Sequence, residues 1–172
     1  ARPDFIKMGI FDEVYLDLLP AEYFGDVYVR SELTDNFSQA RVIVSPDIQS
    51  GKTAEISYEL FSPAGQSLAM ATIGRSESFA IPVANPELWW PTAYGAQPLY
   101  TLKLRLLDQG KALDEKEIKF GIREVKMELK DEKTGEARFG FRINGKKIFM
   151  HGACWAPLEG FTHVWDAKRD AA

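Results

Sequence analysis

Hydrophobic and polar residues alternate along most of this chain, with the period of two that a half-buried β-strand requires. Residues 23–33 show the pattern, because Val27 and Val29 fall on one face and Tyr28 and Arg30 on the other. Similar patterns occupy 8–18, 40–44, 53–61, 66–73, 78–83, 99–107, 113–122 and 123–130. Short strands with turn residues between them and no helical period predict an all-β antiparallel sandwich. Alternation and spacing alone are equally compatible with a jelly roll.

Two prolines refine this prediction. The strand at 40–44 is expected to end at Ser45-Pro46, because proline has no backbone N–H to donate to a neighbouring strand. Pro82 lies inside the segment 78–83, and a proline inside a strand is tolerated mainly at the edge of a sheet. The sequence therefore predicts an edge position for the strand at 78–83.

The strongest local signal is Asn144-Gly145, which stands between two short apolar runs. Asn and Gly readily adopt the two positive φ angles of a type I′ turn, so the sequence predicts a β-hairpin here. The return strand, residues 146–150, leads into the small residues at 152–154 and then into Trp155. Two interpretations follow from the residues alone. Trp155 is either a core residue in a loop after the hairpin, or it is delivered by a barrel strand to a sugar-binding face.

Composition narrows the classes of function. The 172 residues are enough for one domain and part of another. A net charge of −4 lacks the polycationic character of proteins that bind nucleic acid or a membrane surface. No apolar run reaches the roughly 18 residues of a transmembrane helix, and the N-terminus lacks the charged-then-apolar pattern of a signal peptide. The single cysteine, Cys154, excludes an internal disulfide and leaves the compartment undetermined.

The residues themselves do not indicate catalysis or a cofactor. His151 and His163 are 12 positions apart without an acidic or cysteine partner at ligand spacing, so no metal site is predicted. There is no phosphate loop and no dinucleotide fingerprint, so no nucleotide cofactor is expected. Trp89 and Trp90 suit stacking on a sugar, but we expect them to anchor a long loop on the sandwich or against the next domain.

Three motifs stand in order between residues 88 and 157. They are the loop LWWPTAYGAQPLY at 88–100, the junction FGIREV at 120–125 and the run INGKKIFMHGACWAP at 143–157. Together they resemble glycoside hydrolase family 2, the family of β-galactosidases, β-glucuronidases and β-mannosidases. The loop resembles the family's tryptophan loop, the junction its passage from the middle sandwich to the catalytic barrel, and the run the entry to that barrel. The Trp-x-Pro ending is most similar to the β-mannosidase branch.

The resemblance implies three parts. Residues 1–19 would end a preceding jelly-roll, sugar-binding-like domain. Residues 20–122 would form an immunoglobulin-like antiparallel β-sandwich. Residues 123–172 would be the N-terminal fragment of the catalytic (β/α)8 or TIM barrel, comprising the hairpin and the first barrel strand.

The resemblance also implies where the chemistry lies. The family takes its acid/base and its nucleophile, both Glu residues, from later barrel strands, and the acid/base Glu follows an Asn. None of the three asparagines here is followed by Glu, so the catalytic residues are predicted to be missing from this chain. Trp155 would line the subsite for the non-reducing sugar, with Cys154 and Glu159 beside it on the same segment. Position 154 departs from the β-mannosidase pattern, where Asn or Asp is usual, and a thiol is a poor hydrogen-bond partner for a sugar.

The sequence thus predicts the non-catalytic sandwich of a glycosidase that removes terminal β-linked mannose from an oligosaccharide or glycoside with retention of configuration. One alternative keeps the family and changes the specificity to β-galactoside, β-glucuronide or glucosaminide. A second is a stand-alone carbohydrate-binding or adhesion sandwich. The junction at 120–125 and the hairpin argue against the second, because a binding module has no use for an orphan barrel strand.

Overall fold

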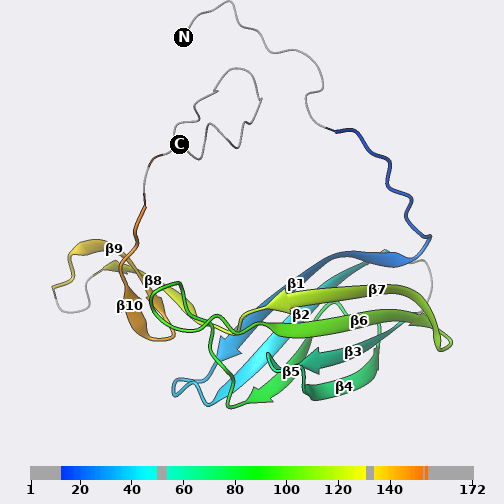
Figure 1. Ribbon diagram of the computed structural model, residues 1–172, viewed down its shortest axis with the longest axis horizontal. Helices are drawn as coiled ribbons and strands as arrows, with labels where there is room; N and C mark the ends of the chain where they lie inside the picture. Colours follow the sequence, from blue (N-terminus) through cyan, green and yellow to red (C-terminus); the bar gives the residue numbers. More distant parts are fainter. Residues whose placement is uncertain (1–12, 50–53, 131–133, 153, 155–172) are drawn as a thin grey trace, which may run out of the picture. The chain divides into compact units, whose positions relative to one another are not determined.

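Seven strands build two antiparallel sheets that face each other (Figure 1). The computed structural model describes residues 13–49, 54–130, 134–152 and 154. One sheet has the order β1-β2-β5, with β1 at Tyr23–Leu33, β2 at Gln39–Gln49 and β5 at Phe79–Ala84. The other has the order β4-β3-β6-β7, with β3 at Glu55–Phe61, β4 at Ser67–Gly74, β6 at Tyr100–Asp108 and β7 at Lys111–Phe120.

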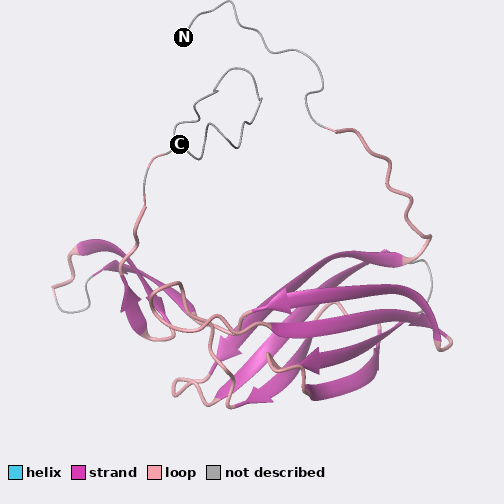
Figure 2. Cartoon of the chain, in the orientation of Figure 1, coloured by secondary structure: helices cyan, strands magenta, loops and turns pink. Residues whose placement is uncertain are grey.

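The strand order is that of an immunoglobulin-like sandwich. The chain changes sheet from β2 to β3, from β4 to β5 and from β5 to β6, so each sheet is assembled from strands distant in sequence. The sheet β1-β2-β5 corresponds to strands A, B and E, and β3-β6-β7 to strands C, F and G, with β4 on the edge beside β3. All regular structure among the described residues is β (Figure 2), which confirms the predicted all-β antiparallel class; the barrel fragment predicted at 123–172 stays a prediction.

The core lies between the two sheets and consists of the inward positions that the alternation predicts. On β6, Leu102, Leu104 and Leu106 are fully buried, while the intervening Lys103 and Arg105 face solvent. Burying each such aliphatic side chain contributes roughly 1.5–3 kcal/mol. The same alternation gives fully buried residues on the neighbouring strand β3, Ile56 and Leu60, and on the facing sheet, Val42, Val44 and Ile81.

A separate three-stranded sheet follows the sandwich. It has the order β10-β9-β8, with β8 at Val125–Lys130, β9 at Ala137–Ile143 and β10 at Lys146–Ile148. Asn144 and Gly145 join β9 to β10 with φ angles of 48° and 74°, so the predicted hairpin turn is confirmed. Residues 19–150, which include this sheet and the sandwich, form one compact unit.

Several predicted strand bounds are corrected. Residues 13–18, the described part of the strand expected at 8–18, are not in a strand, because no described strand pairs with them. The strand expected to end at Ser45-Pro46 continues to Gln49. Proline is tolerated there because β5 pairs with β2 only up to Val44, which leaves Pro46 paired with β1 alone. The edge position predicted for the strand containing Pro82 is confirmed, since β5 is the edge of its sheet.

Tyr100 ties the long β5–β6 connection to the core. Its side chain is 2% exposed, and its hydroxyl oxygen accepts a hydrogen bond of 2.8 Å from the backbone N–H of Glu87. The position resembles the tyrosine corner of immunoglobulin-like sandwiches, in which a tyrosine near the start of strand F bonds to upstream backbone. Burial raises the pKa of Tyr100 above 10.0, and the nearby Glu87 charge adds to this, although the hydrogen bond from Glu87 opposes it.

A raised pKa in the folded state means that folding favours the protonated phenol. The stability linked to Tyr100 is therefore present below about pH 10 and lost as the pH rises above it. We expect Tyr100→Phe to lower the free energy of unfolding by about 1 kcal/mol at neutral pH, through the lost hydrogen bond. Between pH 9 and pH 11 the variant should lose less further stability than the parent chain.

Urea unfolding at several pH values measures both effects. Tyr28→Phe is the matched control for removal of a surface hydroxyl, because Tyr28 is 64% exposed and its replacement should change the free energy of unfolding by less than about 0.5 kcal/mol at neutral pH. Identical slopes for the parent chain and Tyr100→Phe above pH 10 would contradict the assignment.

Candidate functional site: the junction between the sandwich and the hairpin sheet

The tryptophan loop predicted at 88–100 is held against the start of the hairpin sheet. Leu88 pairs with Ile122 as an isolated parallel bridge, and the backbone N–H of Trp89 donates to the carbonyl of Ile122 at 2.9 Å. Ile122 is completely buried. This pairing ends β7 at Phe120, two residues before the predicted end of that strand, because Ile122 bonds to the loop instead of to β6.

Trp89 is seated on Gly121. A Cβ atom at position 121 would lie 2.6 Å from Cγ of Trp89, closer than any side chain allows, so only glycine fits beneath the indole. The guanidinium of Arg123 lies over the same indole, 4.6 Å from the ring centre, in a cation–π contact. The first two motifs of the sequence therefore contact each other, and the Gly and Arg of the junction both serve to hold Trp89.

Arg123 is also fixed through its backbone. Its N–H donates to Oγ of Ser31 at 3.2 Å, and the Ser31 hydroxyl donates to its carbonyl at 2.8 Å. Ser31 lies on β1, so this reciprocal pair connects the first strand of the sandwich to the chain that enters the hairpin sheet.

Asn144 completes the junction from the hairpin side. It is 6% exposed and is the one buried polar residue among those described. Its Nδ2 donates to the carbonyl of Trp89 at 3.0 Å, its Oδ1 accepts the N–H of Glu124 at 2.9 Å, and its own N–H donates to the carbonyl of Glu124 at 3.0 Å. The sequence indicated only a turn here, since the pattern Asn-Gly carries no sign of partners 20 and 55 residues away.

The tip of the tryptophan loop contacts the end of the hairpin. The hydroxyl oxygen of Tyr94 accepts the backbone N–H of Phe149 at 2.9 Å, and the ammonium of Lys146 lies 5.4 Å from the Tyr94 ring centre. Within the loop, Trp90 packs on Gly95, where a Cβ atom would come within 2.8 Å of the indole. The loop thus fixes the direction in which the chain leaves β10.

The predicted substrate-binding residues follow directly after this junction. Cys154 is an exposed free thiol. Trp155 and Glu159 lie outside the described residues, as does His163. Their predicted roles therefore stay predictions, and the structure contributes the anchored hairpin from which their segment begins.

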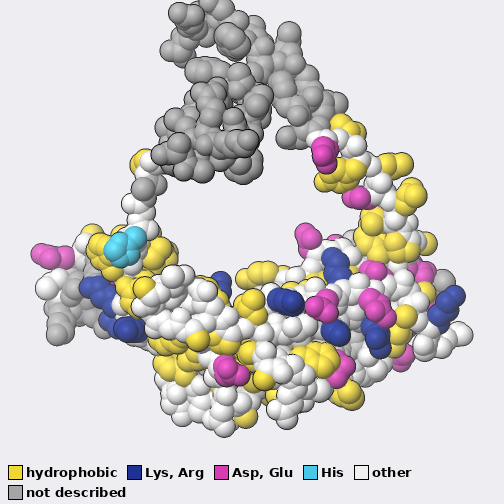
Figure 3. Space-filling view, viewed as in Figure 1, with side chains coloured by type: hydrophobic (Ala, Val, Ile, Leu, Met, Phe, Trp, Pro, Cys, Tyr) yellow, Lys and Arg dark blue, Asp and Glu magenta, His cyan; other side chains and the backbone are white. Residues whose placement is uncertain are grey.

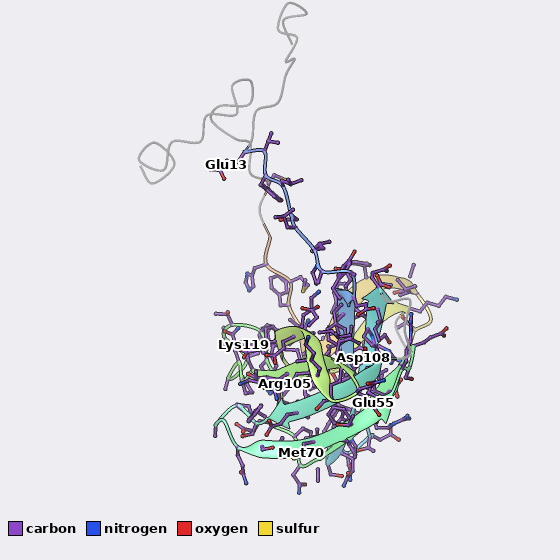
Figure 4. The ribbon with its side chains drawn as sticks, turned by 90° about the vertical axis from the view of Figure 1, so that its right-hand side faces the viewer. Glu13, Glu55, Met70, Arg105, Asp108 and Lys119 are labelled. Atoms are coloured by element: carbon purple, nitrogen blue, oxygen red, sulfur yellow. The ribbon has the colours of Figure 1, made fainter. Side chains whose placement is uncertain are left out.

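Among the described residues, no group of three His, Cys, Asp or Glu side chains is placed to hold a metal ion. A hollow across β3, β4 and β6 is lined by charged and polar residues, among them Lys103 and Arg105, and by the apolar Met70 and Ala71. These cations pair with Glu117 at 3.9 Å and Glu115 at 2.9 Å. Figure 4 shows the labelled Glu55, Arg105 and Lys119 on strands of this sheet, which presents a solvated, charge-paired face.

No helix among the described residues has both the length and the apolar character to span a bilayer.

Comparison with known families agrees with the motifs. The family model described as glycosyl hydrolases family 2 matches residues 22–123, more than half of the chain. This chain belongs to that family. The match covers the sandwich and ends at Arg123, the residue that lies on Trp89.

Two relatives within this family are β-mannosidases. Beta-mannosidase B of Emericella nidulans is 32% identical in an alignment of 163 residues that covers 91% of this chain and 19% of that protein. Beta-mannosidase B of Neosartorya fischeri is 29% identical over 172 residues, covering 97% of this chain and 20% of the relative. The predicted similarity to β-mannosidases is confirmed, and the chain spans about a fifth of the length of the curated relatives it matches.

Solved structures with a similar fold include those of a β-glucuronidase. The apo structure of β-glucuronidase from Ruminococcus gnavus superposes with a TM-score of 0.60 and 25% identity, over 78% of this chain and 20% of that one. The same enzyme in complex with N1-substituted uronic isofagomine gives a TM-score of 0.61 at 25% identity, with the same coverage.

Asn144 provides a test of the junction. We expect Asn144→Ala to lower the free energy of unfolding by about 3 kcal/mol. Two lost side-chain hydrogen bonds contribute about 1 kcal/mol each, and alanine at a left-handed φ contributes roughly 1 kcal/mol. Denaturant unfolding of the 172-residue chain measures the change.

Asn85→Ala is the matched control for the free-energy cost of placing alanine at a left-handed φ. Asn85 has a φ of 46°, close to the 48° of Asn144, but its side chain is exposed. Its replacement should cost about 1 kcal/mol, so the difference of about 2 kcal/mol reports the hydrogen bonds of Asn144. Equal losses in the two variants would show that the junction does not depend on the Asn144 side chain.

Proposed function

We propose that this chain is the non-catalytic sandwich region of a β-mannosidase-like enzyme, one that removes terminal β-linked mannose from oligosaccharides or glycosides with retention of configuration. The observation that carries the proposal is the 32% identity to beta-mannosidase B over 91% of the chain. The identity extends beyond the family model's limit at residue 123, into the hairpin sheet and the segment after it.

The three-part division belongs to this proposal. Residues 1–19 would close a preceding sugar-binding-like domain, 20–122 form the sandwich, and 123–172 begin the catalytic barrel. The junction supports a mechanical role for the sandwich. Trp89, Arg123 and Asn144 fix the start and the turn of the hairpin sheet, and Tyr94 fixes its end. A rigid support of this kind positions the polypeptide that follows, and catalytic geometry tolerates displacements of only about 1 Å.

Substrate contact is assigned to the segment after the hairpin. Trp155 would stack on the non-reducing sugar, with Cys154 and Glu159 on its margin. Exposure of the Cys154 thiol is compatible with this placement. The second candidate keeps the fold and changes the sugar to a β-glucuronide, which is favoured by the structural similarity to the β-glucuronidase of Ruminococcus gnavus.

The 172-residue chain by itself should hydrolyse no aryl β-mannoside, β-galactoside or β-glucuronide above the uncatalysed rate. Retaining hydrolysis needs two carboxylates about 5–5.5 Å apart across the sugar, and the family takes both from later barrel strands. Release of a chromogenic aglycone measures the rate. Turnover that survives repurification and is lost on mutating one acidic residue within the chain would overturn the proposal.

The longer protein, with the polypeptide its relatives carry after this region, should cleave an aryl β-mannoside in preference to the β-glucuronide and release β-mannose first. Within it, Trp155→Ala should lower kcat/KM on the order of 10- to 100-fold with the melting temperature unchanged, because the residue positions substrate. Trp155→Phe is the control, since it keeps an aromatic face at the same position and should retain most of the activity. A lowered melting temperature with unchanged kcat/KM would make Trp155 a packing residue.

A further inference from the structure

The turn that joins β9 to β10 has a chemical property besides its structural one. Asn144-Gly145 is the one Asn-Gly pair in the sequence. In such a pair the backbone nitrogen of the glycine loses its proton and bonds to Cγ of the asparagine, while the side-chain nitrogen leaves as ammonia. Water then opens the resulting succinimide to aspartate or to isoaspartate, in which the backbone runs through the side chain. Glycine favours the reaction because it has no Cβ atom to obstruct the approach.

The other two asparagines are poor candidates for the same reaction. Asn36 is followed by Phe37, whose side chain hinders the attacking nitrogen, and Asn85 is followed by Pro86. Proline has no backbone N–H to lose, so it cannot close the neutral succinimide. Asn144 is therefore the asparagine at which deamidation is expected when the chain is unfolded, and Asn36 is an internal reference.

In the folded chain the Asn144 side chain is held at both of its polar atoms. Nδ2 donates to the carbonyl of Trp89 at 3.0 Å, and Oδ1 accepts the N–H of Glu124 at 2.9 Å. Attack at Cγ turns the planar amide into a tetrahedral centre, so both hydrogen bonds must weaken before the new bond forms. Asn144 is also largely buried, which restricts the access of the water that the reaction consumes.

The glycine of the pair is covered by a connection of the sandwich. A Cβ atom at position 145 would lie 3.3 Å from Cζ of Phe37, so this ring lies against the turn. Phe37 belongs to the connection between β1 and β2, where its own N–H donates to the carbonyl of Thr34 at 2.8 Å. Lys and Arg side chains are exposed over the hairpin sheet (Figure 3), and Nη1 of Arg142 donates to the carbonyl of Gly145 at 3.1 Å. Both contacts restrict the motion that would bring the Gly145 nitrogen to Cγ.

We propose that Asn144 is a site of spontaneous deamidation that the folded junction suppresses, so that opening of the junction sets the rate of modification, and that the products destabilise the junction. Local opening of a folded protein exposes such groups at a free energy at or below that of global unfolding. The modification needs no enzyme, and water is the co-reactant. It is independent of the sugar on which the longer protein acts, and it therefore goes beyond the proposed function.

The modified residue does not fit the folded junction. A carboxylate at position 144 has no hydrogen to donate, so it turns an oxygen towards the carbonyl of Trp89 in a largely buried place. Burial of a charge and loss of the hydrogen bond are both destabilising. Isoaspartate in addition lengthens the backbone of a two-residue turn, which disturbs the register of Ile143 with Lys146. Each product therefore favours the open junction.

A comparison of folded and unfolded chain measures the suppression. The 172-residue chain is incubated in mildly alkaline buffer with and without guanidinium chloride, and peptide mass spectrometry follows the conversion of each asparagine. Conversion at Asn144 should be at least about tenfold slower in the folded chain. In guanidinium chloride Asn144 should react faster than Asn36. Equal rates at Asn144 in the two conditions, or faster conversion of Asn36 in guanidinium chloride, would overturn the proposal.

Phe37→Ala tests whether the junction controls the rate. The variant removes the ring from the turn and leaves the partners Trp89 and Glu124 in place, so conversion at Asn144 in the folded chain should rise about three- to tenfold. Tyr28→Ala is the matched control, because it removes an exposed aromatic ring from β1 and should leave the rate unchanged. Circular dichroism verifies that both variants are folded. Equal rates in Phe37→Ala and the parent chain would contradict control by the junction.

Asn144→Asp tests the consequence directly. It should lower the melting temperature of the 172-residue chain by about 4 °C or more. The deamidated chain, separated on an anion exchanger by its extra negative charge, should show a similar loss. Asn36→Asp is the control, because Asn36 is exposed and its Oδ1 accepts hydrogen bonds that a carboxylate also accepts, so the change should stay below about 2 °C. A deamidated chain that melts at the temperature of the parent would show that the junction accommodates the product, against the proposal.

Discussion

The close approach of Trp89 to Gly121 is the contact on which the rest of the junction depends. A side chain at position 121 would overlap the indole, so the loop and the junction segment lie together only because residue 121 has no Cβ. This approach brings the Trp89 N–H to the carbonyl of Ile122 and places Arg123 over the ring. It also presents the Trp89 carbonyl to Asn144. One small residue therefore determines where β7 ends and how the next sheet is attached.

The attachment uses polar contacts, whereas the sandwich uses an apolar core. The hydrogen bonds at Asn144 are directional and lie in a largely buried position, so they specify one arrangement of the hairpin relative to the loop. The core residues of β2, β3 and β6 supply stability with less directional preference. A module that supports another domain benefits from this division, because the sandwich can remain folded while the junction fixes a direction.

The two kinds of relative describe different aspects of the chain. Sequence similarity leads to β-mannosidases, and structural similarity to a β-glucuronidase. This sandwich fold occurs in enzymes that are named for different sugars, so the fold does not determine which sugar is bound. What the sandwiches share is the packing of two sheets. We propose that differences in specificity belong to the segment around Cys154, where this chain has a thiol in place of the Asn or Asp that the resemblance to β-mannosidases implies.

The sequence by itself determined the elements whose signals are local. Alternation on β1 and β6 predicted which side chains face the core, Pro82 predicted an edge strand, and Asn144-Gly145 predicted the turn. It failed at Pro46, where the tolerance for proline depends on how far β5 extends along β2. The motifs at 88–100 and 120–125 were recognisable, but their mutual contact was not, because Trp89 and Gly121 are 32 positions apart and no periodicity connects them. Only the tertiary structure decided that Asn144 joins three segments, since this depends on which parts of the chain meet in space.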